Sequence, residues 1–253
     1  MQKIILDLCG GTGAWGLPYK QNGYEVINLT LPDYDVTKWQ EYADIVRLIS
    51  EKKVYGILAA PPCTMFSDAR TNAKTPRDLI GGMGTVKACL EIVWECQSKT
   101  VSDQQKYPPL KFWALENPWY GRLKWFLGQP NYIFNPWEFG DNYKKKTALW
   151  GYFNDPVKIY QDVNVVMSKE DLDRSKTNSR KLPKFDKLLM KDLTELKTIT
   201  ALPTWKNTKT RQMLRGITPQ GFANALPELP NLGFSSGNGN SIVIFFFLAK
   251  NQK

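Results

Sequence analysis

One cysteine, Cys63, is better placed than any other residue of this sequence to act as a nucleophile. It follows the apolar run GILAA (residues 56–60) and two prolines, Pro61 and Pro62. A short apolar run of this kind predicts a buried strand, and proline ends the strand because it has no N–H group for the hydrogen-bond ladder. The strand therefore presents a thiol at its carboxyl end, where a thiolate could act in covalent catalysis.

The absence of histidine restricts the chemistry of this thiol. Ser-His-Asp hydrolysis, Cys-His thiol hydrolysis and His-ligated metal catalysis are all excluded. The thiolate of Cys63 must instead be produced by nearby cations, a helix N-terminus or the substrate. The remaining cysteines, Cys9, Cys89 and Cys96, show no CxxC spacing. We therefore expect no metal site and no disulfide, and we expect Cys89 and Cys96 to pack in the core.

Two other apolar runs also end in polar residues. The run KIILDLCGGTG (residues 3–13) contains Asp7 and continues into a glycine-rich turn, and LKFWALENP (residues 110–118) contains Glu116. A carboxyl group at a strand end could bind a substrate or transfer a proton. The alternative for Glu116 is a structural ion pair with Arg122. The tryptophans of this region, Trp113, Trp119 and Trp125, are expected to fill the core.

The segments between these runs show helical periodicity. Apolar side chains recur at helical spacing within residues 39–53 and 84–97, in the second segment at Val86, Leu90, Val93 and Trp94. Strands that alternate with helices predict a Rossmann-like, doubly wound, mostly parallel α/β sheet. The carboxyl ends of parallel strands share one edge, where ligands bind, so we expect the polar ends of the three runs to lie close together.

These motifs together resemble those of the cytosine-5 DNA methyltransferases, and more narrowly of the compact enzymes of phages and prophages. DLCGGTGAW (7–15) resembles the motif that receives S-adenosylmethionine, APPCTMFS (60–67) the nucleophile loop, and ALENP (114–118) the segment whose glutamate binds the target base. FGDNYKKKTALWG (139–151), RGITPQGFANAL (215–226) and GNGNSIV (237–243) resemble later motifs. The resemblance implies a class I methyltransferase fold.

The resemblance also implies three groups of site residues. The catalytic residues would be Cys63, Glu116 and Lys145. The cofactor-binding residues would be Asp7, Cys9, Gly10, Gly11, Thr12, Gly13, Trp15, Asp35, Pro61, Asn240 and Ser241. Among these, Trp15 would contact the adenine ring and Asp35 its amino group. The DNA-binding residues would be Lys144, Lys145, Lys146, Arg211 and Arg215.

The sequence departs from the family pattern at two places. The second predicted strand, in YEVINLTLPDYDV (24–36), carries Asn28 or Thr30 where the family places an acidic residue for the ribose hydroxyls. In the basic stretch, the family has arginines around a glutamine. The comparable places of this sequence hold Tyr143, Lys145 and Thr147. Lysine offers a point charge and not the planar fork of arginine.

Charge is concentrated in one part of the chain. The net charge is +10, and residues 141–215 contain 17 Lys or Arg against 9 Asp or Glu, which supplies +8 of it. Such an excess suits a face that meets nucleic-acid phosphates, although a solubilising surface explains it as well. We predict a catalytic core at 1–151, a small basic target-recognition region at 152–212 and a C-terminal segment at 213–253 that returns to the core.

The expected function is transfer of a methyl group from S-adenosylmethionine to C5 of a flipped-out cytosine in double-stranded DNA. Two alternatives remain open: the same mechanism on RNA or with a modified S-adenosyl donor, and a catalytically inactive DNA-binding relative. Residues 1–8 are too short and too soon polar for a signal peptide, and the apolar run IVIFFFLA (242–249) is too short to span a membrane. We expect a cytoplasmic monomer, in a bacterium or a phage-infected cell, with no membrane partner.

Overall fold

The computed structural model describes residues 2–68, 74–98, 110–170, 172–173 and 216–225. The described strands are β1 (Ile4–Leu8), β2 (Glu25–Leu29), β3 (Val54–Ala59), β4 (Phe112–Pro118), β5 (Tyr132–Phe134) and β6 (Thr147–Tyr152). The described α-helices are α1 (Leu17–Gln21), α2 (Ala43–Ser50), α3 (Leu79–Ser98), α4 (Lys124–Leu127), α5 (Val163–Val166) and α9 (Gln220–Ala225). Three 3₁₀ turns complete the described elements: η1 (Val36–Glu41), η2 (Cys63–Met65) and η3 (Pro136–Phe139).

The six strands form one sheet in the order β2-β1-β3-β4-β6-β5. The first four strands of this order are parallel, and β6 runs antiparallel to both of its neighbours, β4 and β5. Three of the parallel strands, β1, β3 and β4, are almost fully buried, as expected where helices cover both faces, whereas β2 at the edge of the sheet is only partly buried. The fold is therefore a mixed α/β, Rossmann-like sheet, which confirms the fold class expected from the sequence.

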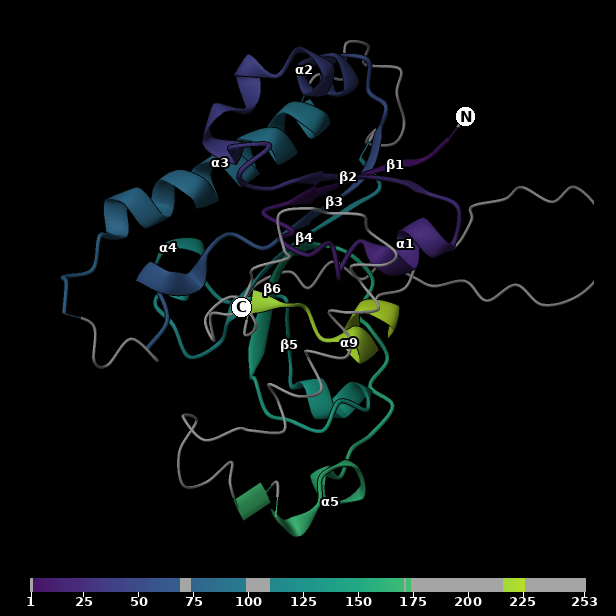
Figure 1. Ribbon diagram of the computed structural model, residues 1–253, viewed down its shortest axis with the longest axis vertical. Coiled ribbons are helices and arrows are strands. Elements are labelled where there is room, and N and C mark those ends of the chain that lie inside the picture. Colours follow the sequence, from purple (N-terminus) through teal and green to yellow (C-terminus); the bar gives the residue numbers. More distant parts are fainter. Residues whose placement is uncertain (1, 69–73, 99–109, 171, 174–215, 226–253) are drawn as a thin grey trace, which may run out of the picture.

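Two apolar clusters lie on opposite faces of this sheet. One cluster joins alternate residues of β1, such as Leu6, to α2, α3 and η1 through Ile45, Val86 and Trp39. The second joins the intervening residues, such as Ile5, to α1, η3 and α9. Figure 1 shows the same division, with α2 and α3 together on one side of the strands and α1 and α9 on the other.

The helix predicted from the sequence over residues 39–53 differs from the observed structure. The periodicity of residues 39–53 predicts one helix, whereas the structure has the 3₁₀ turn η1, a break at Tyr42 and then α2. The break follows from tertiary contacts of the Tyr42 side chain. Its hydroxyl accepts a hydrogen bond from the backbone N–H of Asp35 at 2.9 Å, and its ring packs edge-on against Tyr34.

Helix α3 is confirmed, but its buried face is offset from the predicted one. Val86, Cys89, Val93 and Cys96 are buried, at the spacing of one helix face, and this confirms the expected burial of the two cysteines. Trp94, which recurs at helical spacing with Val86, Leu90 and Val93, is 68% exposed. Its position is one residue, about 100° of helix rotation, beyond the buried Val93.

Of the tryptophans expected in the core, Trp113 and Trp119 pack against the cluster beneath α3. Trp125 does not, because it lies on the single turn α4 and is 68% exposed. In the described residues, no helix is both long enough and apolar enough to cross a membrane, and no group of three or more metal-binding side chains occurs. The apolar run 242–249 lies outside the described residues.

The predicted division into three regions stays a prediction. Most of the target-recognition region and most of the C-terminal segment lie outside the described residues. The part of the C-terminal segment that is described, residues 216–225, packs on the core through α9. Phe222 is fully buried and stacks on Phe134 of β5 at 3.9 Å between ring centroids, and the backbone N–H of Gly221 donates to Asp141 at 3.2 Å.

Candidate active site

The nucleophile loop begins where β3 ends. After Ala59 the two prolines leave the ladder, and Pro62 precedes the 3₁₀ turn η2, whose first residue is Cys63. The backbone carbonyl of Cys63 accepts hydrogen bonds from the N–H groups of Phe66 at 3.0 Å and Ser67 at 2.8 Å. Phe66 is fully buried and anchors the turn. The local sequence thus fixes the backbone that carries the thiol.

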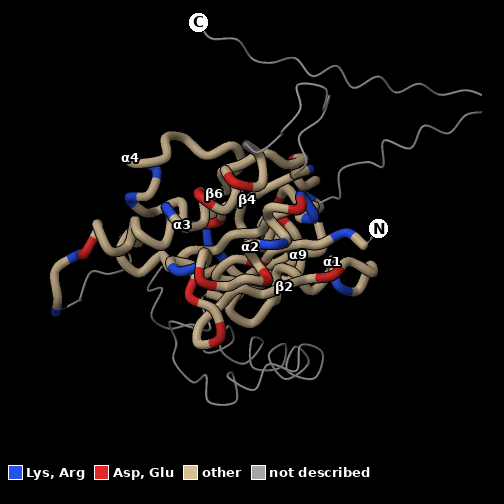
Figure 2. The backbone as a smooth tube through the Cα atoms, turned by 90° about the horizontal axis from the view of Figure 1, so that it is seen from above, with Lys and Arg blue, Asp and Glu red and all other residues tan. Residues whose placement is uncertain are grey.

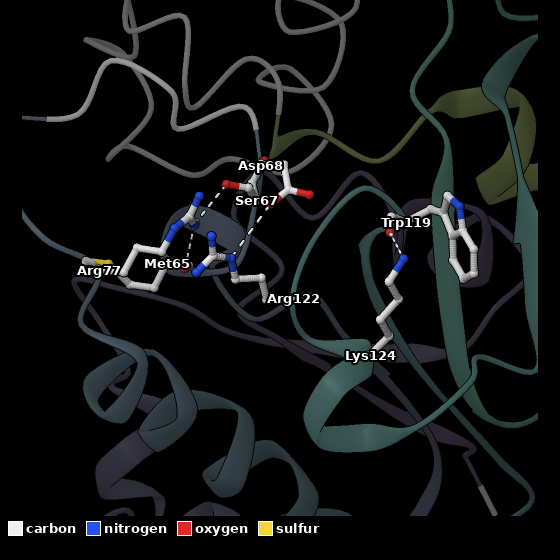
Figure 3. Close-up of polar contacts among 7 residues, drawn as sticks. All are labelled: Met65, Ser67, Asp68, Arg77, Trp119, Arg122 and Lys124. Atoms are coloured by element: carbon white, nitrogen blue, oxygen red, sulfur yellow. Dashed lines mark hydrogen bonds and ion pairs between the residues drawn. The ribbon is translucent and has the colours of Figure 1, made fainter.

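Arg77, which lies before α3, holds the far end of this loop. Its guanidinium donates to the backbone carbonyls of Met65 at 2.9 Å and Ser67 at 3.0 Å (Figure 3). Both hydrogen bonds come from the same terminal nitrogen of the guanidinium, so Arg77 bridges the two carbonyls. The sequence analysis did not single out Arg77, since an isolated arginine carries no motif signal. We assign it a positioning role in the nucleophile loop.

The loop is also attached to the segment that follows Glu116. The amide nitrogen of Asn117 donates to the carbonyl of Pro61 at 3.0 Å, and Asn117 is almost fully buried. Further along, the N–H of Arg122 donates to the carbonyl of Phe66, and the N–H of Asp68 to that of Tyr120. The sequence analysis quoted Asn117 inside ALENP but assigned it no role. The structure gives it one, because it joins the ends of β3 and β4.

Glu116 lies inside β4 rather than after it. The strand β3 leaves the ladder at Ala59, opposite Leu115, but β6 continues to pair with β4 as far as Pro118. The carboxyl group of Glu116 therefore lies at the carboxyl edge of the parallel strands while its backbone stays in the sheet. Its side chain is mostly buried, and Oε1 has no hydrogen-bond partner among the described residues.

Lys145 is brought to Glu116 by the turn that precedes β6. Its Nζ lies 3.5 Å from Oε1 of Glu116, and both side chains are largely buried. Two hydrogen bonds fix this turn: the hydroxyl of Thr147 donates to the carbonyl of Lys145 at 2.7 Å, and the N–H of Trp119 to that of Lys146 at 2.9 Å. Arg122 instead pairs with Asp68, at 3.8 Å (Figure 3). The structural ion pair between Glu116 and Arg122 considered from the sequence is therefore absent.

The thiol, the carboxyl and the ammonium group act on one another electrostatically. Burial raises the pKa of Cys63 above its usual value, Lys145 lowers this pKa and Glu116 raises it. Lys145 and Glu116 thus have opposite effects on the pKa of Cys63, and burial makes the net shift upward. In this state the thiol stays protonated at neutral pH, so its reactivity depends on the charges beside it.

This arrangement predicts opposite effects for two substitutions on the alkylation of Cys63. Lys145→Met removes the cation that lowers the pKa, so alkylation by iodoacetamide at about pH 8 should slow several-fold. Glu116→Gln removes the anion that raises the pKa, so alkylation should accelerate by a similar factor. Peptide mass spectrometry over time follows Cys63 separately from the other cysteines. Equal rates in both variants would show that the three groups are not coupled.

The glycine-rich turn after β1 closes over the carboxyl group of Asp7. A Cβ atom at Gly10 would lie well inside 3.0 Å of the carboxyl carbon and both oxygens of Asp7. A Cβ atom at Gly16 would lie 2.7 Å from Val26 and 3.1 Å from an oxygen of Asp7. Glycine is therefore required at Gly10 and Gly16 for steric reasons. Gly11 and Gly13 have φ values of 57° and 75°, which glycine adopts without strain.

Two side chains of the second strand region hold the same turn. The N–H of Gly11 donates to the hydroxyl of Thr30 at 3.2 Å, and the amide of Asn28 donates to the carbonyl of Gly11 at 3.1 Å. These are the two residues found in place of the acidic residue that the family carries. Their described polar contacts are made to the backbone of the turn, so this end of β2 positions the turn and offers no carboxylate.

Asp7 is fully buried, and its environment favours the protonated acid. Burial raises the pKa of Asp7 to about 7, although the backbone N–H of Gly16 lowers it somewhat. In the unfolded chain the same group has a pKa of 3.8. The contribution of Asp7 to stability is therefore fully present below about pH 4 and is lost as the pH rises through about 7.

We therefore expect Asp7→Asn to flatten part of the pH dependence of stability. The amide is isosteric and stays neutral, so the free energy of unfolding of the variant, relative to that of the native chain, should rise between about pH 4 and 7. A shift of about 3 pKa units sets an upper value of about 4 kcal/mol for this change. Urea unfolding at several pH values measures the difference. A difference that does not change with pH would contradict a buried, protonated Asp7.

The other residues expected at the cofactor site lie in different surroundings. Cys9, with φ of 57°, packs beside the core, and Thr12 is buried with its hydroxyl accepting from the N–H of Ala14. Trp15 is 1% exposed and packs against Phe222, so its ring lies in the core and not on the surface where an adenine would lie. Asp35 is the N-cap of η1, where it accepts from Thr37.

Four expected site residues lie outside the described residues: Arg211, Arg215, Asn240 and Ser241. Most of the net positive charge also lies outside the described residues, because residues 174–215 contain 12 Lys or Arg against 3 Asp or Glu, which is +9 of the total of +10. In the described part of the chain, positive and negative residues are interspersed (Figure 2). The basic DNA-binding face therefore stays a prediction.

Comparison with protein-family models finds no match for this chain, and comparison with curated proteins finds none either. Among solved structures, the chain is similar to the methyltransferase EhMeth of Entamoeba histolytica, with 10% identity and a TM-score of 0.36. This similarity covers 64% of the present chain and 57% of the other chain, so the chain spans little more than half of that protein. A likeness this distant carries no functional argument.

The fold and the site by themselves define a class of protein. It is a Rossmann-like α/β protein in which a thiol, a carboxyl and an ammonium group meet at the carboxyl edge of β3 and β4, and in which a glycine-rich turn follows the neighbouring strand β1. This edge is the usual ligand site of such sheets.

Proposed function

We propose that this protein is a DNA (cytosine-5) methyltransferase that uses S-adenosylmethionine. One observation carries the proposal: a half-buried thiol, Cys63, lies within electrostatic reach of the Glu116 carboxyl and the Lys145 ammonium, at the edge of the sheet where ligands bind. Without histidine in the chain, this set suits covalent addition to an electrophilic ring better than it suits hydrolysis.

The chemistry of cytosine explains why these three groups are needed. C5 of cytosine is too weak a nucleophile to attack a methylsulfonium group unaided. The thiol of Cys63 gives its proton to the Glu116 carboxylate as its sulfur forms a bond to C6, and Glu116 passes that proton to N3, so the electron pair of the C5–C6 bond becomes available at C5. After C5 has accepted the methyl group, loss of the C5 proton re-forms the double bond and expels Cys63.

Glu116 and Lys145 have distinct tasks in this scheme. Oε1 of Glu116 lies buried and has no hydrogen-bond partner among the described residues, so a ring nitrogen of the base could take that place. The pair with Lys145 orients the carboxyl group and keeps a positive charge near the thiol, which favours the thiolate. Asn117 and Arg77 hold the loop that carries Cys63 at its two ends.

The glycine-rich turn fits the proposed cofactor. Gly11 and Gly13 carry no side chains, and Thr30 and Asn28 hold the turn in place, so a ligand could approach its backbone closely. When bound, S-adenosylmethionine would supply an electrophilic methyl group on a sulfonium. The turn follows β1, which pairs directly with β3, so cofactor and thiol would lie on adjacent strand ends.

The proposed substrate requires that a cytosine leave the base stack, because C6 is not accessible inside the duplex. Base flipping costs a few kcal/mol, which phosphate contacts must offset. Lys144 and Lys146 flank Lys145 and could supply such contacts, and Lys146 lies over the ring of Trp119. Arg211 and Arg215 would extend this contact surface.

Transfer of a labelled methyl group to duplex DNAs of different sequence tests the proposal, with nucleoside mass spectrometry of the product. The expected result is 5-methylcytosine in DNA.

One observation favours a second candidate function. No carboxylate lies at the end of β2, where the cytosine-5 methyltransferases bind the ribose hydroxyls, so the donor of this protein could be a modified S-adenosyl compound. A heavier adduct on C5 would identify that donor. Absence of any cytosine product in DNA or RNA would overturn both.

A further inference from the structure

The outer face of α3 is apolar and exposed. Ile80 is 89% exposed and Trp94 is 68% exposed, and with Phe126 of α4 they border a groove of about 810 Å³. The remaining residues that line the groove are Leu79, Met83, Gly84, Lys87, Leu90 and Glu91. The first turns of α3 extend beyond the strands in Figure 1. Contiguous apolar surface of this kind usually marks an interaction site.

The spacing along this face is that of a helix pair. Ile80, Gly84, Lys87, Glu91 and Trp94 follow one another at intervals of four, three, four and three residues. These intervals place the five residues along one stripe of the helix, called the seam below, with an exposed apolar side chain at each end and room for a second helix to pack against it. Two oppositely charged residues, Lys87 and Glu91, stand in the middle of the seam, and this limits which partner helix can fit.

A second copy of the same helix satisfies these charges in one antiparallel register. In that register Lys87 faces Glu91 of the second copy, and the same two-fold axis sets Trp94 against Gly84 of the second copy. Moving the partner by one seam position would place Lys87 against Lys87 of the second copy, or Glu91 against Glu91, and would set like charges face to face. Charge and side-chain size therefore select the same register independently of each other.

Gly84 offers the space that this register requires. A Cβ atom at Gly84 would meet nothing within 4 Å, so the position is open on the surface. A large indole needs such a gap in the opposing helix, because a side chain there would hold the two helices apart. Lys87 and Glu91 already form an ion pair within the helix at 2.7 Å. In the two-fold arrangement each charge would gain a second partner.

We propose that the protein forms a homodimer through antiparallel packing of α3 against α3 of a second copy, in place of the monomer expected from the sequence. The interface is isologous, so each contact occurs twice. It buries the exposed tryptophan of both copies and places no charge opposite a like charge. It uses the outer face of α3, whereas the inner face, with Val86 and Cys89, packs on the sheet.

Charge reversal tests this register directly. Sedimentation equilibrium of the full chain should give twice the chain mass of 29.0 kDa. Lys87→Glu and Glu91→Lys should each sediment as monomers, because each places like charges face to face. An equimolar mixture of the two variants should again give a dimer, since every facing pair then has opposite charges. The double variant should return to the homodimer. Both side chains are exposed, so the fold should tolerate the changes.

A second set of variants tests the gap at Gly84. Gly84→Gln fills the space that the indole needs and should weaken the dimer at least tenfold, whereas Thr85→Gln, next to it and off the seam, should leave the dimer unchanged. Circular dichroism checks that each variant folds. The proposal is overturned if the native chain sediments at 29.0 kDa at all concentrations, or if the single charge reversals stay dimeric.

Discussion

Replacement of Cys63 by alanine is expected to reduce methyl transfer by on the order of 10⁴-fold or more, the scale seen when a covalent nucleophile is removed. In the proposed mechanism C5 of the base reacts only after Cys63 has added to C6, so removal of the thiol leaves C5 unreactive. Binding of S-adenosylmethionine should change little, because the thiol follows β3 and the glycine-rich turn follows β1. Labelled transfer and calorimetric titration of the cofactor measure the two effects.

The chain provides a matched control for this substitution. Cys96 is a buried cysteine on the inner face of α3, where it is part of the apolar cluster, and Cys96→Ala should cost stability but keep transfer. A duplex that contains 5-fluorocytosine should trap the native chain covalently, because fluorine cannot leave C5 as a proton does. The Cys63 variant should form no adduct. If it retains transfer, or loses cofactor binding to the same extent, Cys63 is not the nucleophile.

Gly10→Ala should destabilise the fold by on the order of 3 kcal/mol and abolish binding of S-adenosylmethionine. The added Cβ would lie well inside 3.0 Å of the whole carboxyl group of Asp7, and that group is enclosed and cannot move aside. The turn must therefore shift, and it carries the backbone that the cofactor would approach. Chemical denaturation and cofactor titration give the two quantities.

A double variant separates this steric effect from other causes. In an Asp7→Ala background the carboxyl group is absent, so the further change Gly10→Ala should cost far less than it does in the native chain. The difference between the two costs is the interaction energy of the pair. Independent, additive costs would mean that the glycine is required for a reason other than contact with Asp7.

Much of the fold could be predicted from local sequence patterns. The apolar runs ending near Leu8, Ala59 and Pro118 are strands, and the segments between them contain helices, because burial along one element leaves a periodic trace in the sequence. Since parallel strands share one carboxyl edge, the meeting of Cys63 with Glu116 also follows from the pattern. The order of the motifs along the chain suggested the chemistry.

Other features depend on contacts between residues far apart in the chain, which leave no local trace. The pairing of Glu116 with Lys145 rather than Arg122 follows from the position of β6 beside β4. The burial of Trp15 follows from the packing of α9 against α1. Sequence periodicity indicates whether a residue lies on the buried or the exposed face of one element. It does not indicate which residues of other elements it contacts.

The sequence by itself thus determined the alternation of strands and helices, the chemical types at the strand ends and the exclusion of histidine chemistry. Only the tertiary structure decided which cation stands beside the carboxyl group, that Asp7 is enclosed by its own glycine turn, and that the outer face of α3 is left apolar and open. The reason is physical: hydrogen bonding and burial within an element are local, whereas charge pairing and steric fit depend on which elements become neighbours.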